Sequence, residues 1–256
     1  MINNYPRPVV SVLLASHQMN NFLLISINSI LQQTLEDIEL IFVANGVDCV
    51  EISNYVKINV VDPRLVILTS PVAQLAHSLN IALSASRADL VARMDADDIS
   101  VLDRLQSQVD YIKKNELDMV GGDLECIDIL GEKIGKRIYP KGKSINRILP
   151  FSNPFAHNTI LIKKEILLLA RGYNSGFNTE DYDLWLRLKR QDVRWDNMSK
   201  VLVLYRIHPN STQRRLLGYA EATGLVVREF LITKNPIFII ASAFHCLKSF
   251  IRPTRK

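Results

Sequence analysis

The sequence predicts an α/β fold in which a mostly parallel sheet is flanked by helices, and three observations support this prediction. Apolar runs of strand length alternate with segments of helical periodicity over the first half of the chain. The chain has 256 residues, of which 48% are hydrophobic, so one large domain can bury a sizeable core. No repeat or low-complexity linker interrupts residues 9–208, which favours one continuous domain.

The first half of the chain has the clearest strand and helix signals. A β-branched and aliphatic run predicts a strand at 9–14, and the asparagines that follow it can cap a helix. Similar runs and spacings predict a helix at 22–31, strands at 39–43 and 65–68, a helix at 75–85 and a strand at 90–94. Because ligands bind beyond the carboxyl ends of parallel strands, the loops at Ser16, Asn45 and Asp95 should share one rim.

The second half continues with an amphipathic helix marked by Leu102, Leu105, Val109 and Ile112. Strands with glycine turns are predicted at 119–122 and around 127–138, and a further helix around 184–188.

Composition and charge exclude several classes of protein. Three cysteines lie far apart and in no metal-ligand spacing, which indicates a reduced, cytoplasmic setting. The N-terminus lacks a charged leader followed by a long apolar core, so secretion is not expected. Net charge is only +5, and the basic residues form neither a stripe nor an aromatic-interleaved patch. We therefore expect no nucleic-acid partner.

The segment 236–247 is almost wholly apolar and is flanked by basic residues such as Lys234, Lys248 and Arg252. Its length of about 12 residues is too short to span a bilayer, which needs ~20. The pattern predicts a helix that lies on the anionic cytoplasmic face of the inner membrane. The alternative is a C-terminal helix packed on the domain or on a partner.

Three carboxylates crowd the end of the predicted strand at 90–94, in the sequence Asp95-Ala96-Asp97-Asp98. Neighbouring carboxylates repel one another unless a proton or a cation neutralises part of their charge. Mg²⁺ and Mn²⁺ are suitable cations because they prefer oxygen ligands. Arg93 precedes the cluster closely enough to orient a carboxylate. Acidic turns often only cap helices, but the position beyond a buried strand favours a metal or nucleotide site.

A second acidic group, Glu180-Asp181-Tyr182-Asp183, opens the helix predicted around 184–188. Acidic residues in a first turn complement the helix dipole, and Thr179 could serve as the cap. A carboxylate in such a place can also act as a general base. The residues alone leave both interpretations open.

Eight motifs give the chain a resemblance to family 2 glycosyltransferases over roughly residues 9–212. In order they are Val10-Ser11-Val12-Leu13-Leu14, Ile30-Leu31-Gln32-Gln33-Thr34, Glu39-Leu40-Ile41, Asp62-Pro63-Arg64, Ala92-Arg93-Met94-Asp95-Ala96-Asp97-Asp98, Arg104-Leu105, Glu180-Asp181-Tyr182-Asp183-Leu184-Trp185-Leu186-Arg187-Leu188 and Tyr205-Arg206-Ile207-His208. An ordered set of this length is far more specific than any single motif in it.

The resemblance implies a GT-A fold, an inverting reaction, a UDP-linked sugar donor and a divalent metal, Mn²⁺ or Mg²⁺. It further implies a glycan or lipid-linked glycan acceptor in surface-polysaccharide biosynthesis. The domain would cover residues 1–212, with a nucleotide-binding half at about 1–105 and an acceptor half at about 106–212. Residues 213–256 would form a C-terminal helical tail that can associate with the membrane.

The resemblance also implies residue roles. Asp97 resembles the metal ligand, with Asp95 and His208 as further metal ligands and Asp98 as a helper. Asp181 resembles the general base, and Glu180 would tune it. The implied nucleotide-sugar contacts are Ser16, Asn45, Arg64, Arg93, Asp95, Asp97 and Arg206. His157 is a weaker candidate on the acceptor side.

The chain departs from the family in the donor loops. Asn45 occupies a position where an aspartate usually contacts the base, and its neutral amide oxygen can still accept a hydrogen bond from a uracil imide. Two other functions remain as alternatives. One is a noncatalytic nucleotide-sugar-binding scaffold subunit. The other is a sugar nucleotidyltransferase, which needs a glycine-rich phosphate loop that residues 15–21 lack.

Overall fold

The computed structural model describes residues 7–174, 176, 178–207 and 216–251. Within them, nine strands form one sheet in the order β3-β2-β1-β4-β8-β6-β9-β5, and β7 pairs with β6. The strands are β1 (Val10–Ser16), β2 (Ile38–Asn45), β3 (Leu65–Ser70), β4 (Leu90–Met94), β5 (Ile99–Ser100), β6 (Met119–Ile127), β7 (Lys133–Arg137), β8 (Leu161–Lys163) and β9 (Trp195–Arg206). The helices are α1 (Leu23–Leu31), α2 (Cys49–Asn59), α3 (Leu75–Ala85), α4 (Arg104–Lys114), α5 (Lys143–Ile148), α6 (Lys164–Leu169), α7 (Glu180–Lys189), α8 (Leu216–Thr233) and α9 (Ile237–Ile251), with a 3₁₀ turn at His157–Thr159.

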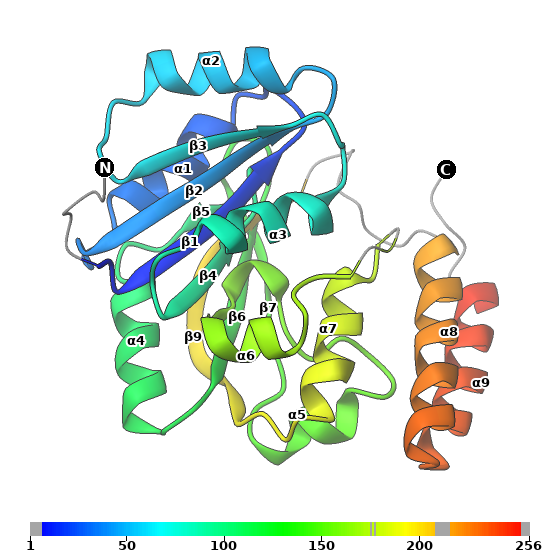
Figure 1. The fold of residues 1–256 in the computed structure, drawn as a ribbon. Coiled ribbons are helices and arrows are strands. Elements are labelled where there is room, and N and C mark those ends of the chain that lie inside the picture. The colour runs from blue at the N-terminus through cyan, green and yellow to red at the C-terminus, as the bar shows by residue number, and fades with distance from the viewer. Residues whose placement is uncertain (1–6, 175, 177, 208–215, 252–256) are drawn as a thin grey trace.

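The first four strands of the sheet are parallel, as the sequence predicts. β1 lies between β2 and β4, and β3 extends the sheet beyond β2 (Figure 1). The register sets Leu14 opposite both Phe42 and Met94, so the carboxyl ends of β1, β2 and β4 meet at one edge. This edge carries the loops after Ser16 and Asn45 and the acidic loop.

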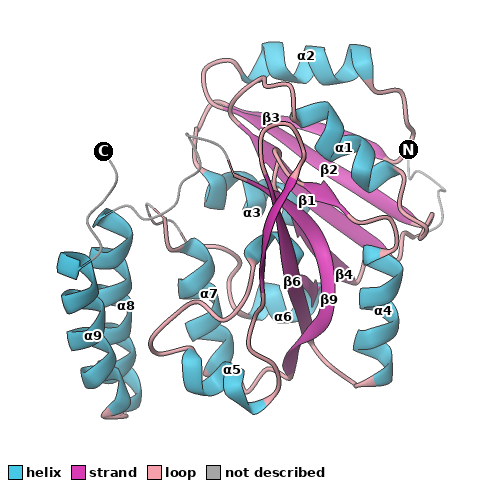
Figure 2. Ribbon diagram, turned by 180° about the vertical axis from the view of Figure 1, so that it is seen from behind, coloured by secondary structure: helices cyan, strands magenta, loops and turns pink. Residues whose placement is uncertain are grey.

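Helices cover both faces of the parallel half because alternate side chains of each strand point to opposite sides. Val12 and Leu14 of β1 belong to a core shared with α1, α2 and α4. Leu13 belongs to a second core, shared with α3, α6 and α7. Figures 1 and 2 show α3 and α1 on opposite faces of the sheet.

The sheet is mixed beyond β4, and here the structure adds elements that the sequence did not predict. Strand β8 is antiparallel to both β4 and β6, whereas β6 and β9 are parallel. Strand β9 was missed because polar residues such as Asn197 and Lys200 interrupt its apolar run.

Helix α2, between β2 and β3, was also missed. Only Cys49, Ile52, Ser53 and Val56 are buried in it, which gives a weak periodic signal.

The C-terminal region consists of two helices packed side by side, α8 and α9, at one end of the molecule (Figure 2). Helix α9 packs on the domain, where the Phe244 ring lies 5.7 Å from that of Phe151 and His245 Nε2 lies 3.0 Å from the Pro150 carbonyl oxygen. The packed alternative for the apolar segment is therefore confirmed. Among the described residues, no helix is both long and apolar enough to cross a bilayer.

Candidate active site

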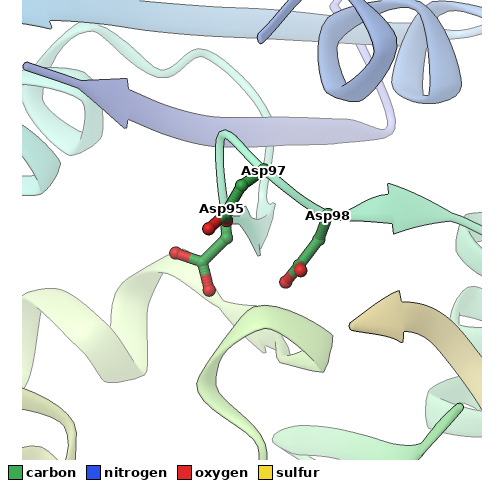
Figure 3. A group of neighbouring side chains, drawn as sticks. All are labelled: Asp95, Asp97 and Asp98. Atoms are coloured by element: carbon green, nitrogen blue, oxygen red, sulfur yellow. The ribbon is translucent and has the colours of Figure 1, made fainter. Parts of the chain in front are cut away.

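The acidic loop, Asp95 to Asp98, connects β4 to β5 at the carboxyl edge of the sheet. Its three carboxylates converge, with one oxygen of each within 4.8 Å of the others (Figure 3). Asp98 is fully buried, and its oxygens accept hydrogen bonds from Asn158 Nδ2 and from the backbone N–H of Arg206 (2.8 Å). Burial, together with the charges of Asp95 and Asp97, raises the pKa of Asp98 well above its ordinary value.

The Arg206 side chain supports the acidic loop from behind. Its Nε donates to the Asp97 carbonyl oxygen (3.0 Å) and its Nη1 to the Asp128 carbonyl oxygen (3.0 Å). The guanidinium also stacks 4.2 Å from the centre of the Phe22 ring, and the residue is only 3% exposed. This geometry differs from the predicted contact with a nucleotide diphosphate, because the guanidinium is used to hold the loop backbone.

The Arg93 side chain is buried beside the acidic loop, where its Nη1 forms an ion pair with Asp95 Oδ2. Burial alone would lower the pKa of Arg93, but the charge and hydrogen bond of Asp95 outweigh it and raise the pKa above the ordinary value. The Arg93 Nε has no hydrogen-bond partner in the part of the chain that the structure describes. Arg93 is therefore a cation held in place by Asp95, and its Nε–H has no acceptor among these residues.

The second acidic group opens helix α7, where Glu180 and Asp181 are the first two residues. Asp181 accepts hydrogen bonds from Asn153 Nδ2 and from the backbone N–H of Tyr182 (2.6 Å), which fix its orientation. Burial still raises the pKa of Asp181 above its ordinary value. Burial and the charge of Asp181 raise the pKa of Glu180 from 4.5 to about 7.

The two acidic groups belong to one site, and Arg93 connects them electrostatically. The charge of Arg93 lowers the pKa of both Glu180 and Asp181, whereas the charge of Asp95 raises that of Glu180. Charge effects fall off with distance, so these groups lie near one another. The fold thus unites residues that lie more than eighty positions apart in the sequence.

An aromatic pair lies beside Arg93. His157 Nε2 lies 3.2 Å from the Tyr173 hydroxyl, and the His157 ring contacts the buried Trp185 edge-to-face. Burial, and then the charge of Arg93, holds the pKa of His157 well below its ordinary value. His157 is consequently a neutral group at pH 7, able to donate or accept one hydrogen bond.

The donor side of the site contains Ser16 and Asn45 at the ends of β1 and β2. Ser16 is nearly buried and donates from Oγ to the Gln18 carbonyl oxygen (2.8 Å). Asn45 Nδ2 donates to Ser78 Oγ (2.7 Å), and that hydroxyl in turn donates to Gln74. Because the Ser78 hydroxyl proton is committed, the amide of Asn45 cannot be reversed. Its buried Oδ1 has no partner among the described residues.

Arg64 lies away from this site, so its predicted role as a pocket residue is wrong. It precedes β3 and sits at the amino edge of the sheet, opposite the edge that carries the acidic loop. Its Nη2 bonds Asp62 Oδ2 (2.8 Å) and the Leu31 carbonyl oxygen (2.7 Å). The error arose because the motif Asp62-Pro63-Arg64 identifies the family but not the edge on which the residue lies.

The residues of the acidic loop fit a divalent cation. Asp97 is partly exposed, and one oxygen of Asp95 remains beyond the ion pair with Arg93. Asp98 is less suited to a direct ligand role, because both of its oxygens accept hydrogen bonds. The third predicted ligand, His208, lies outside the described residues.

Three site residues were not predicted in these roles: Asn153, which holds Asp181; Asn158, which holds Asp98; and Tyr173, which contacts His157. The available signal was the clustering of Asn153 and Asn158 around a proline and a histidine. No periodicity identifies such residues.

Comparison with known proteins agrees with this geometry. The profile of the family described as Glycosyl transferase family 2 matches residues 11–168. An O-antigen biosynthesis glycosyltransferase of Escherichia coli, WbnJ, is 43% identical over 95% of this chain and 97% of its own length. Another E. coli relative is the UDP-Gal:alpha-D-GlcNAc-diphosphoundecaprenol beta-1,3-galactosyltransferase, 29% identical over 81% of this chain and 78% of its own.

The fold is also shared with a solved structure. That of S. aureus TarS residues 1–349 in complex with UDP-GlcNAc superposes with a TM-score of 0.66 at 15% sequence identity. The match covers 87% of this chain and 66% of that one.

Proposed function

Because the chain belongs to glycosyltransferase family 2, we propose that it transfers a sugar from a UDP-sugar to a hydroxyl group of a lipid-linked glycan in surface-polysaccharide biosynthesis. The observation that carries this proposal is the meeting of two acidic groups around Arg93 at the carboxyl edge of the sheet. The acidic loop suits a metal-bound diphosphate, and the acidic start of α7 suits an attacking hydroxyl. The named substrates of the relatives support the choice of donor and acceptor.

Asn45 supports the proposal that the base of the donor nucleotide is uracil. Its fixed, unpartnered Oδ1 is an acceptor that a uracil imide N–H can satisfy. A buried acceptor without a partner is costly, so a base that supplies the donor is stabilised there. A cytosine ring nitrogen at the same place has no proton to donate. The substitution of an amide for the usual acid therefore preserves the preference for uracil.

Asp97 and the second oxygen of Asp95 would hold a Mn²⁺ or Mg²⁺ ion. The metal would act as a Lewis acid that neutralises charge on the departing diphosphate. Arg93 holds Asp95 in place by their ion pair, and Asn158 and Arg206 hold the loop from behind. These contacts preorganise the carboxylates so that no rearrangement is needed when the donor binds.

Asp181 would take the proton from the acceptor hydroxyl as it attacks the anomeric carbon opposite the leaving diphosphate. A single displacement of this kind inverts the anomeric centre. The raised pKa of Asp181 makes it a stronger base than a solvated carboxylate. The hydrogen bond from Asn153 fixes the orientation of its carboxylate. Burial and the charge of Asp181 in turn raise the pKa of Glu180, beside it, to about 7.

The outer face of α8 and α9 would bring the protein to the cytoplasmic face of the membrane, where a lipid-linked acceptor resides. Leu231, Ile240 and Leu247 are each about 60% exposed on these helices. Lys234 and Lys248 flank them, as expected for a surface that meets anionic lipid. The division into a domain at 1–212 and a tail at 213–256 stays a prediction.

The test measures sugar transfer from a panel of UDP-sugars with Mn²⁺ in the purified protein and in three variants. Asp97→Asn and Asp181→Asn should each lose transfer, whereas the exposed Asp110→Asn on α4 should retain it. A thermal shift with UDP and Mn²⁺ should survive in Asp181→Asn and disappear in Asp97→Asn. Binding of every UDP-sugar without turnover in the unmodified protein would instead favour the scaffold alternative.

A further inference from the structure

Helix α8 is joined to the catalytic helix α7 by a network of charged side chains, in which both carboxylates are buried. Asp183 of α7 accepts from Arg228 Nη1 of α8 (2.5 Å) and from Arg187 Nε (2.7 Å). Glu229 of α8 accepts from Arg228 Nη2 (2.9 Å) and is paired with Arg190 near the end of α7. Asp183, Arg187 and Glu229 are all under 5% exposed. Because Asp183 and Glu229 are buried, separating them from their arginine partners would leave unpaired buried charges, and this favours one packing of α8 on α7.

A second link joins α8 to the segment that leads into α7. Glu221 Oε2 accepts hydrogen bonds from the backbone N–H of Asn178 (2.9 Å) and from Thr179 Oγ1 (3.0 Å). Thr179 is the N-cap residue of α7, and among the described residues its side chain makes no capping bond to that helix. Its hydroxyl is oriented by Glu221 instead. The direction in which α7 begins is thus set by a carboxylate on α8.

These two links bracket the acidic pair. Glu221 holds Asn178 and Thr179, the residues immediately before Glu180, and Arg228 holds Asp183, two residues after Asp181. We propose that α8 is a positioning element of the active site, in which Glu221 and Arg228 set the place of the Asp181 carboxylate. This proposal rests on the proposed role of Asp181 as the base.

The physical reason lies in the demands of proton transfer. A general base acts only within hydrogen-bond reach of the hydroxyl, and a displacement of about 1 Å can reduce the rate about 10²-fold. Asp181 is in the first turn of α7, where a helix frays most easily. Contacts on both sides of it prevent that motion. Helix α8 is therefore a positioning element of the active site as well as part of a candidate membrane surface.

The test compares Glu221→Ala with Arg190→Ala in the full chain. Each variant removes one polar link between α7 and α8, but Arg190 lies nine residues beyond Asp181, about 13 Å along the helix. We expect Glu221→Ala to lower kcat about tenfold or more with the donor KM within about twofold, because the donor contacts lie on other loops. Arg190→Ala should keep kcat while lowering the unfolding midpoint to a similar extent. Glu221→Gln, whose amide oxygen can still accept both bonds, should restore most of kcat.

The proposal is wrong if Glu221→Ala keeps the kcat of the unmodified protein. It is also wrong if Arg190→Ala loses as much kcat as Glu221→Ala when the two variants have the same unfolding midpoint. It also falls if the loss in Glu221→Ala appears in the donor KM alone. Asp181→Asn, measured beside them, separates this result from the proposed function. Full transfer by Asp181→Asn overturns the base assignment itself, whereas an inactive Asp181→Asn with an unaffected Glu221→Ala overturns only the positioning role.

Discussion

Replacing Glu180 by glutamine tests the electrostatics of the acidic pair. In the folded protein the pKa of Glu180 rises from its ordinary value of 4.5 to about 7, chiefly through burial and then through the charge of Asp181. A carboxylate whose pKa is raised on folding stabilises the native state at low pH, and that stability is lost as the pH rises through about 7. Above pH 7 the charged Glu180 therefore opposes folding.

The size of the effect follows from the shift. A difference between 4.5 and about 7 corresponds to about 3 kcal/mol, and screening of the partly exposed side chain reduces this to about 1–2 kcal/mol. For a chain of this size, we expect Glu180→Gln to raise the unfolding midpoint by roughly 2–6 °C at pH 8.5. At pH 4, where Glu180 is mostly protonated in both the folded and the unfolded protein, the midpoints should nearly coincide.

The same substitution should leave the acid limit of sugar transfer nearly unmoved. The proton that is taken up near pH 7 goes to Glu180, and the Asp181 carboxylate remains charged there as the base. In both proteins, transfer should therefore decline only at a lower pH, where Asp181 itself is protonated. Metal-free thermal unfolding and a pH–rate profile measure the two effects. A stability difference that is the same at pH 4 and pH 8.5, or a transfer rate that falls through pH 7 in the unmodified protein and recovers in Glu180→Gln, would contradict this account.

Three further predictions follow from the site and the tail. Asn158→Ala should lower the free energy of unfolding by about 1–3 kcal/mol, since it removes one of the two hydrogen bonds to the buried Asp98; urea unfolding measures this, with the exposed Asn146→Ala as control. Asn45→Ala should bind UDP more weakly in calorimetry, because the imide proton loses its acceptor; unchanged binding would contradict the assigned contact. Ile240→Gln should reduce flotation with anionic vesicles and leave it unchanged with neutral ones; equal flotation of the variant and the unmodified protein would reject the membrane surface.

Sequence patterns predicted β1, β2 and β4 well because these strands are buried on both faces, and α1 and α3 because they have clear apolar stripes. The strand predicted at 90–94 is β4, and the strand predicted at 39–43 lies within β2. Short or polar elements gave no such signal. Strand β8 has three residues, and β9 carries Asn197 and Lys200 within its run. Their places depend on pairing with β6, which only the complete sheet determines.

Local arrangements of residue types are enough to identify the family, the acidic loop beyond β4 and the acidic start of α7. Which residues meet in space depends on the tertiary structure. It brought Arg93 between the two acidic groups, moved Arg64 to the opposite edge of the sheet, and used Arg206 to hold the loop. It also set Glu221 against the start of α7. The physical reason is that these contacts join residues far apart in the chain, and strand order and helix packing fix them.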